Sequence, residues 1–118
     1  MLTLPSSVRV YIALDPINLH LSFDRLAGLV RRLGLDPTTG HLFVFVNRQK
    51  THMKILFFDR SGFCMLYKRL ERGTFEVPSI GPDGAVKREL TPSELGLILE
   101  GVALDARPRR ARLGRSAP

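Results

Sequence analysis

Residues 53 to 70, MKILFFDRSGFCMLYKRL, contain two apolar runs separated by the four residues DRSG. The runs are rich in aromatic and branched side chains, which favour β-strands, and DRSG holds residue types that form tight turns. A connection this short joins antiparallel strands, because parallel neighbours require a long crossover. The stretch therefore predicts a β-hairpin with strands at 53–58 and 63–70. Gly62, the last residue of this turn, is able to take a positive φ angle.

Three further segments have the composition of strands: VRVYIAL (8–14), HLFVFV (41–46) and the short TFEV (74–77). The segment PSIGPDGAVKRE (78–89) is rich in glycine and proline, and we interpret it as a loop or an irregular hairpin. The central strands are apolar on both faces. We therefore expect helices to cover one face of the sheet and a loop or a partner to cover the other.

Apolar residues at helical spacing predict two amphipathic helices, at about 23–33 and 92–102. The first has Ser22 at the N-cap position and Gly34 where a left-handed C-cap belongs. The second follows Thr91, which has the acidic residue of a capping box three places later. The sequence thus predicts an α+β fold, with a mostly antiparallel sheet of four or five strands and two helices.

The 118 residues have the length of one domain, and their formal net charge of +7 is unevenly distributed. Residues 105–118 hold five arginines against Asp105, which amounts to +4, and they show no periodicity. We predict a single α+β domain at 1–104 and a disordered Arg-rich tail at 105–118. An excess of positive charge favours polyanionic partners, most often nucleic acid.

A second concentration of positive charge lies in the folded part, where residues 48–72 hold seven basic residues against Asp59 and Glu71. The predicted hairpin brings Lys54 and Lys68 toward its open end, where we expect them to face each other. Such a cluster suits phosphate contacts, although basic residues beside apolar strands also keep sheet edges soluble. The predicted nucleic-acid contacts are Arg48, Lys50, Lys54, Lys68, Arg69 and Arg72, together with Arg107, Arg109, Arg110 and Arg112 of the tail.

Catalytic and metal-binding groups have weaker support. A metal-dependent nuclease needs two or three converging carboxylates, for which the sequence offers Asp59 with Asp15 or Glu71. Asp59 precedes turn residues, where aspartate bonds its own backbone, so we interpret it as a turn residue. The histidines have no metal-ligand spacing, and no phosphate-binding loop or nucleophile motif occurs. We predict a protein that is not an enzyme and binds no metal or other cofactor.

Three features bear on location. The single cysteine, Cys64, forms no internal disulfide, which fits a reducing cytoplasm. Pro5 and Arg9 stand where a signal peptide has its apolar core, and no apolar run reaches the roughly 18 residues of a membrane helix. We expect a cytoplasmic protein with no membrane partner. The oligomeric state and any DNA site preference stay open.

Four motifs occur in a fixed order and spacing: GHLFVF (40–45), KILFFD (54–59), YKRLERG (67–73) and LTPSELGLILEG (90–101). With the segments around them, over about residues 1–102, they resemble the TnpB accessory proteins encoded by the second reading frame of bacterial insertion elements of family sixty-six. These are not the RNA-guided nucleases that share the name TnpB. The resemblance implies a helper of DNA transposition that works beside a separate transposase, and it brings no catalytic residues. The basic residues of these motifs map onto Lys54, Lys68, Arg69 and Arg72.

The chain departs from the family pattern at His20 and Leu21, where relatives usually have an Arg-Lys pair, and it has no tryptophan. Whether this copy is active therefore stays open. The favoured function is a non-enzymatic accessory protein of transposition that binds DNA, the transposase or both through the basic hairpin edge and the tail. The alternatives are the nuclease and a protein–protein adaptor with an apolar aromatic face made by Phe57, Phe58, Phe63 and Tyr67.

Overall fold

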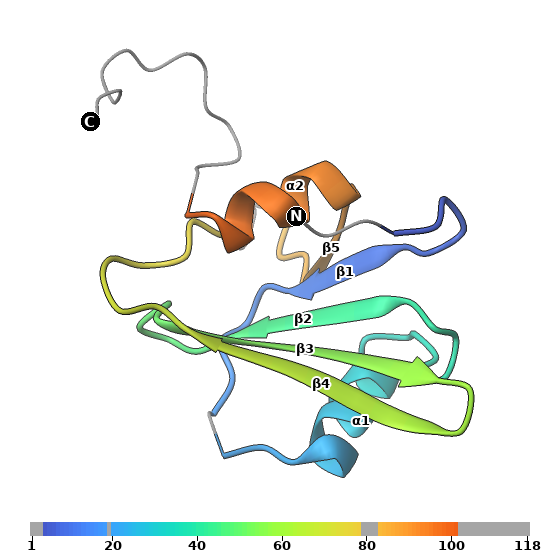
Figure 1. The fold of residues 1–118 in the computed structure, drawn as a ribbon. Helices are drawn as coiled ribbons and strands as arrows, with labels where there is room; N and C mark the ends of the chain where they lie inside the picture. The colour runs from blue at the N-terminus through green and yellow to red at the C-terminus, as the bar shows by residue number, and fades with distance from the viewer. Residues whose placement is uncertain (1–3, 19, 79–82, 102–118) are drawn as a thin grey trace.

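The computed structural model of the protein describes residues 4–18, 20–78 and 83–101. Within these ranges the elements are β1 (Val10–Ala13), α1 (Phe23–Arg32), β2 (Leu42–Val46), β3 (His52–Asp59), β4 (Gly62–Arg69), β5 (Lys87–Leu90) and α2 (Pro92–Leu99) (Figure 1). The predicted α+β class and sheet size are confirmed. No helix in the described part of the chain has the length and apolarity needed to cross a membrane.

The strands form one sheet in the order β4-β3-β2-β1-β5. β1 and β2 are parallel, with Val10 beside Leu42, and every other neighbouring pair is antiparallel. α1 lies between β1 and β2 in the chain and supplies the crossover that a parallel pair requires. The sheet is thus mostly antiparallel, as predicted.

β3 and β4 form the predicted hairpin, in which Asp59 pairs with Gly62 and only Arg60 and Ser61 lie between them. Asp59 therefore borders the turn, as predicted. The positive φ angle of this turn, 44°, belongs to Arg60 and not to Gly62. In a two-residue connection a positive φ angle falls on a central residue, here Arg60, and Gly62 lies beyond the two central residues.

Replacing Arg60 by glycine is expected to raise the free energy of unfolding by about 0.5–1 kcal/mol. At a positive φ angle the Cβ atom of arginine is crowded by the backbone, and glycine has no Cβ atom. Ser61→Gly is the matched control. It relieves no such strain, and it is expected to lower the free energy of unfolding. Urea denaturation measures both, and an Arg60→Gly protein less stable than its parent would contradict the expectation.

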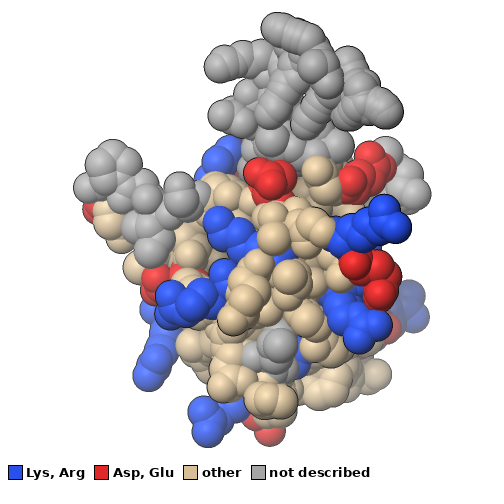
Figure 2. Space-filling model, turned by 90° about the vertical axis from the view of Figure 1, so that its left-hand side faces the viewer, with Lys and Arg blue, Asp and Glu red and all other residues tan. Residues whose placement is uncertain are grey.

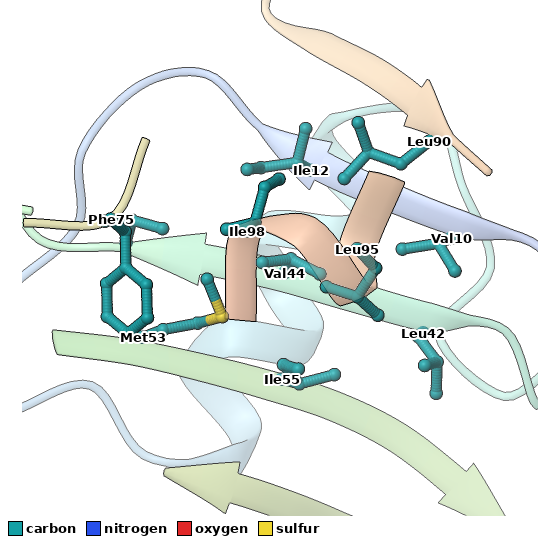
Figure 3. Packing of buried hydrophobic residues seen from close by; sticks show 11 residues of the cluster. Val10, Ile12, Leu42, Val44, Met53, Ile55, Phe75, Leu90, Leu95 and Ile98 are labelled. Atoms are coloured by element: carbon teal, nitrogen blue, oxygen red, sulfur yellow. The ribbon is translucent and has the colours of Figure 1, made fainter. Parts of the chain in front are cut away.

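Buried apolar side chains lie on both faces of the sheet. One cluster joins α2 to the sheet (Figure 3) and consists of Val10, Ile12, Leu42, Val44, Val46, Met53, Ile55, Phe75, Leu90, Leu95 and Ile98. The other joins α1 to the opposite face and consists of Leu26, Ala27, Val30, Phe43, Phe45 and Leu56. β2 is buried at all its residues because it lies between both clusters. The expectation that helices cover only one face is therefore wrong.

The helix boundaries follow the predicted capping residues. The hydroxyl of Thr91 accepts a hydrogen bond from the Glu94 backbone N–H at 3.0 Å, and the Glu94 carboxylate accepts one from the Thr91 N–H at 2.8 Å. This capping box is the predicted one. α2 ends at Leu99, earlier than predicted, and Gly101 follows with a φ angle of 82°. Ser22 precedes α1, but its side chain makes no capping hydrogen bond.

Two segment predictions are wrong. Residues 74–77 are not a strand, and their one buried side chain, Phe75, packs beside Met53 in the α2 cluster. The segment 78–89, interpreted as a loop or an irregular hairpin, contains most of β5, which pairs with the distant β1. The β5 residues Lys87, Arg88 and Glu89 lack the apolar run of a central strand because β5 is the last strand of the sheet and one side of it faces solvent.

The connection between α1 and β2 contains a local turn. The backbone N–H and the hydroxyl of Thr38 both donate to the Asp36 carboxylate, at 2.9 and 2.7 Å. These hydrogen bonds lower the pKa of Asp36 from its ordinary value, since they favour the charged form. The turn ends at Gly40, which has a φ angle of 89°.

Candidate nucleic-acid interface

Two loops that carry positive charge lie side by side at the open end of the β3–β4 hairpin. The first is the β2–β3 connection, residues 47–51, and the second consists of Arg69, the last residue of β4, and the segment 70–75 that follows it. The Leu70 N–H donates to the Thr51 carbonyl at 2.9 Å, and the Phe75 N–H donates to the Lys50 carbonyl at 2.7 Å. The structure therefore joins loops that the sequence separates by about 20 residues.

We name this region the basic end and define it by its four exposed cations, Arg48, Lys50, Arg69 and Arg72. Figure 2 faces the side on which β1 and β2 finish. It shows Lys and Arg side chains distributed around an uncharged centre, with acidic side chains among them. Charge distributed in this way suits several separate phosphate contacts better than one deep anion pocket.

Asn47 organises the first loop. It is 5% exposed, and its side-chain oxygen accepts hydrogen bonds from the backbone N–H groups of Thr51 and His52, both at 2.9 Å. Its amide nitrogen donates to Gln49 and Thr51 at 3.1 and 3.2 Å. Lys50 completes the tight loop with a φ angle of 61°. Sequence reasoning missed Asn47, although an asparagine directly after a core strand is a known turn signal.

The cations of the second loop differ in their partners. Arg69 forms an ion pair with Glu71 at 3.0 Å, and both side chains are more than half exposed, so the pair is weak. Arg72 is exposed, and it forms no ion pair with any residue in the described ranges. Arg72 is therefore the cation of this loop with the least competition for a phosphate.

A hollow of about 380 Å³ lies beside the first loop. Arg48 and Lys50 line it together with Asp15 and Pro16, which follow β1, and with Pro78. It lies at the carboxyl ends of the parallel strands β1 and β2, where open sheets often bind ligands. Asp15 offsets part of its positive charge.

Lys54 does not belong to the basic end. It is 7% exposed, and its ammonium donates to the Leu21 carbonyl at 3.0 Å and lies 5.0 Å from the centre of the Tyr67 ring. The register pairs Lys54 with Tyr67, and Lys68 with Met53. Because side chains alternate between faces along a strand, the two lysines point to opposite faces of the sheet, and the expectation that they face each other is wrong.

Lys68 has a structural contact of its own. Its ammonium donates to the Leu99 carbonyl, the last residue of α2, at 2.8 Å. A cation at this position compensates the unpaired carbonyls and the negative end of the helix dipole. Lys68 therefore holds α2 to β4.

Of the six phosphate contacts predicted in the folded part, the four that define the basic end are exposed. The predicted contacts Arg107, Arg109, Arg110 and Arg112, and the tail that contains them, lie outside the described residues.

Comparison with known proteins points to one family. A family model described as "IS66 Orf2 like protein" matches residues 8–109. The chain belongs to this family. Two uncharacterized proteins of Sinorhizobium fredii (strain NBRC 101917 / NGR234) are similar to it. Protein y4hO is 37% identical over 103 residues, covering 86% of this chain and 87% of its own length, and y4jC is 30% identical over 96 residues, covering 80% of each. No solved structure matches.

Membership of the IS66 Orf2-like family confirms the resemblance and associates the chain with an accessory role in insertion-element transposition. The motifs of the resemblance lie on defined elements: KILFFD in β3, YKRLERG at the end of β4, and LTPSELGLILEG around α2. In this chain Lys54 and Lys68, the lysines of two of these motifs, have structural contacts. His20, at the departure from the family pattern, is exposed on the connection that leads to α1.

The four aromatic residues proposed as an adaptor face do not share one face. Phe57 packs with the α2 cluster, whereas Phe63 packs with the α1 cluster. Phe58 contacts Phe63 edge to face at 5.1 Å, and Tyr67 is 53% exposed on the same side as Phe63. The expectation of one continuous aromatic face is wrong, because residues 57 and 58 point in opposite directions.

The register also separates the carboxylates of the nuclease hypothesis. Asp59 lies at the turn of the β3–β4 hairpin, whereas Glu71 follows its open end. Asp15 follows β1, whose parallel neighbour β2 runs opposite to β3, so Asp15 also lies at the open end. The structure does not bring Asp59 together with either residue. In the described part of the chain, no group of three or more His, Cys, Asp or Glu residues is placed to hold a metal ion.

Proposed function

We propose that this IS66 Orf2-like protein is a non-enzymatic, cytoplasmic accessory protein of transposition that contacts DNA phosphates through the basic end. The observation that carries the proposal is the pair of hydrogen-bonded loops that present Arg48, Lys50, Arg69 and Arg72 at one end of the sheet. Each cation placed against a phosphate releases condensed counterions, so affinity rises with the number of contacts and falls as salt increases.

The exposed loops favour contact with the DNA backbone rather than sequence reading. Phosphate contacts set the position of a protein on the duplex, and sequence is read at the base edges inside the grooves. Both helices of the described region pack one face against the sheet, and α2 carries no Lys or Arg. α1 carries the exposed Arg25, Arg31 and Arg32, which are separate from the four cations of the basic end.

A second candidate function is binding of the transposase of the same element. The observation that favours it is the exposure of two large apolar residues on β4, Leu66 at 46% and Tyr67 at 53%. The two side chains point to opposite faces of the sheet, so a partner placed along the β4 edge contacts both of them. Binding of this kind depends weakly on salt, whereas phosphate binding weakens steeply, so a salt series separates the two functions.

Charge reversal at one position of the basic end tests the first function. Arg72→Glu is expected to weaken binding to a labelled terminal-repeat duplex by about tenfold at low salt, because a phosphate contact becomes a repulsion. Arg60→Glu is the matched control, since it makes the same charge change at the far end of the same hairpin. Fluorescence anisotropy at low and high salt measures both proteins.

The comparison with Arg60→Glu decides how the result is interpreted. An equal loss for Arg60→Glu and Arg72→Glu would mean that total charge alone governs binding, and the basic end would have no special role. No duplex binding by the parent protein at low salt would reject DNA contact outright and leave the transposase as the partner to test.

A further inference from the structure

The two edges of the sheet differ in how they are protected. β5 has four residues, of which Lys87, Arg88 and Glu89 are charged, and charges on a short edge strand discourage another strand from pairing. β4 has eight residues, and its central run, 63–67, has no charge. β4 therefore presents the longer and less protected edge (Figure 1).

The backbone groups that β4 offers at this edge follow from its register. The Leu70 N–H donates to the Thr51 carbonyl, which makes 70 and 51 a hydrogen-bonded pair. Such pairs alternate along antiparallel strands, so residues 62, 64, 66 and 68 direct their backbone groups to β3. Phe63, Met65, Tyr67 and Arg69 direct theirs outward. Within the described ranges these outward groups have no backbone partner.

The side chains of this edge specify a type of partner. Leu66 on the α2 face and Tyr67 on the α1 face are exposed at the middle of the strand. Residues 60–72 hold four Lys or Arg residues against Glu71, and Arg69 and Arg72 are exposed at the end of the strand. A second copy of this chain would set two positively charged edges against each other, whereas an acidic strand complements them.

We propose that the β4 edge binds an extended acidic segment of a partner protein, which adds to the sheet as a strand beside β4. The outward N–H and carbonyl groups of 63, 65, 67 and 69 supply its main-chain hydrogen bonds. Apolar side chains of the segment pack on Leu66 on the α2 face, and its carboxylates alternate to the opposite face beside Tyr67 and lie near Arg69 and Arg72 at the end of the strand. This inference rests on the transposase-binding form of the proposed function and is independent of DNA contact.

The test uses the full chain labelled with ¹⁵N and two synthetic decapeptides, one alternating valine with glutamate and the other valine with lysine. The Val-Glu peptide is expected to shift the amide resonances of 63, 65 and 67, and to protect these amides from hydrogen exchange. The Val-Lys peptide is expected to bind at least about tenfold more weakly, because its charges oppose those of the edge.

Proline at one edge position separates strand addition from surface attraction. Met65→Pro removes an outward N–H while leaving the β3–β4 hydrogen bonds in place, since proline is tolerated at such edge positions. Met65→Pro is expected to weaken binding of the Val-Glu peptide by about tenfold. Met65→Val keeps the N–H and is expected to bind this peptide as the parent protein does. Leu66→Glu is a second variant, which places a negative charge at an exposed position of the edge and weakens binding of the acidic peptide by repulsion. It tests the inference independently if Met65→Pro lowers the stability of the protein.

Several outcomes would overturn the inference. They are equal binding of the two peptides, shifts confined to residues outside β4, binding unaffected by both Met65→Pro and Leu66→Glu, and pairing of two copies through β4 without peptide. Met65→Pro leaves the net charge unchanged, so duplex binding in the same preparation should persist. Absence of peptide binding alone rejects strand addition, and absence of duplex binding by the parent alone rejects DNA contact.

Discussion

Replacing Lys54 with glutamate is expected to lower the free energy of unfolding by at least about 3 kcal/mol, with no DNA present. Lys54 is 7% exposed, and its ammonium donates to the Leu21 carbonyl beneath Tyr67. A carboxylate there would be buried against a carbonyl oxygen, which cannot donate to it. Urea denaturation followed by circular dichroism measures the change.

Two control variants separate the effect of the charge change from the effect of losing the buried hydrogen bond. Lys50→Glu makes the same charge change at an exposed position of the basic end, and it is expected to alter stability by less than about 0.5 kcal/mol. Lys54→Met keeps the apolar stem and leaves the Leu21 carbonyl without this donor, which is expected to cost about 1–3 kcal/mol. A Lys54→Glu protein that is as stable as the parent but binds DNA more weakly would contradict the prediction and indicate that Lys54 contacts phosphate.

Phe75→Ala is the second large expected effect, a decrease of about 3 kcal/mol or more in the free energy of unfolding. Phe75 is fully buried in the α2 cluster although its segment is neither helix nor strand, and it lies beside Met53 (Figure 3). Truncating it removes the main apolar anchor of residues 70–75. The loop that carries Arg72 would then be held chiefly by the backbone bonds to Lys50 and Thr51.

Thermal and urea unfolding of Phe75→Ala should be compared with those of Thr74→Ala, whose residue is exposed and directly adjacent. The control is expected to stay within about 0.5 kcal/mol of the parent. If the two variants were equally stable, segment 70–75 would not depend on Phe75, and the fixed placement of the second basic loop would have no explanation.

The elements predicted well from the sequence are those defined by nearby residues. The β3–β4 hairpin follows from a two-residue turn between apolar runs, and α2 follows from the capping box of Thr91 and Glu94. These signals act over a few residues, so they need no knowledge of the rest of the fold.

The failures concern contacts between distant segments. β5 forms because β1 lies beside it, more than 70 residues earlier in the chain, and KREL alone has no strand pattern. The opposite faces of Lys54 and Lys68 depend on a register that shifts if the turn gains or loses one residue. The structural use of both lysines depends on Leu21 and Leu99, which are 33 and 31 residues away.

The candidate site is predictable only in part. The sequence indicates that Arg48, Lys50, Arg69 and Arg72 belong together, and the structure brings their two loops side by side. A charge count does not distinguish an exposed cation from one that caps a carbonyl, because both lie in the same basic stretch. Burial and hydrogen bonding separate them, and these require the three-dimensional fold.

The most direct test of DNA contact through the basic end compares two full-length variants with the same total charge. One replaces Arg48, Lys50, Arg69 and Arg72 with alanine, and the other replaces Arg107, Arg109, Arg110 and Arg112 with alanine. The measurement is the slope of log affinity against log salt concentration for a terminal-repeat duplex, whose magnitude decreases by about 0.9 for each phosphate that the protein no longer touches. We expect this magnitude to decrease by about 2 or more in the first variant and by less in the second. A first variant that binds like the parent, with the salt dependence abolished only in the second, would contradict the assignment of DNA contact to the folded basic end.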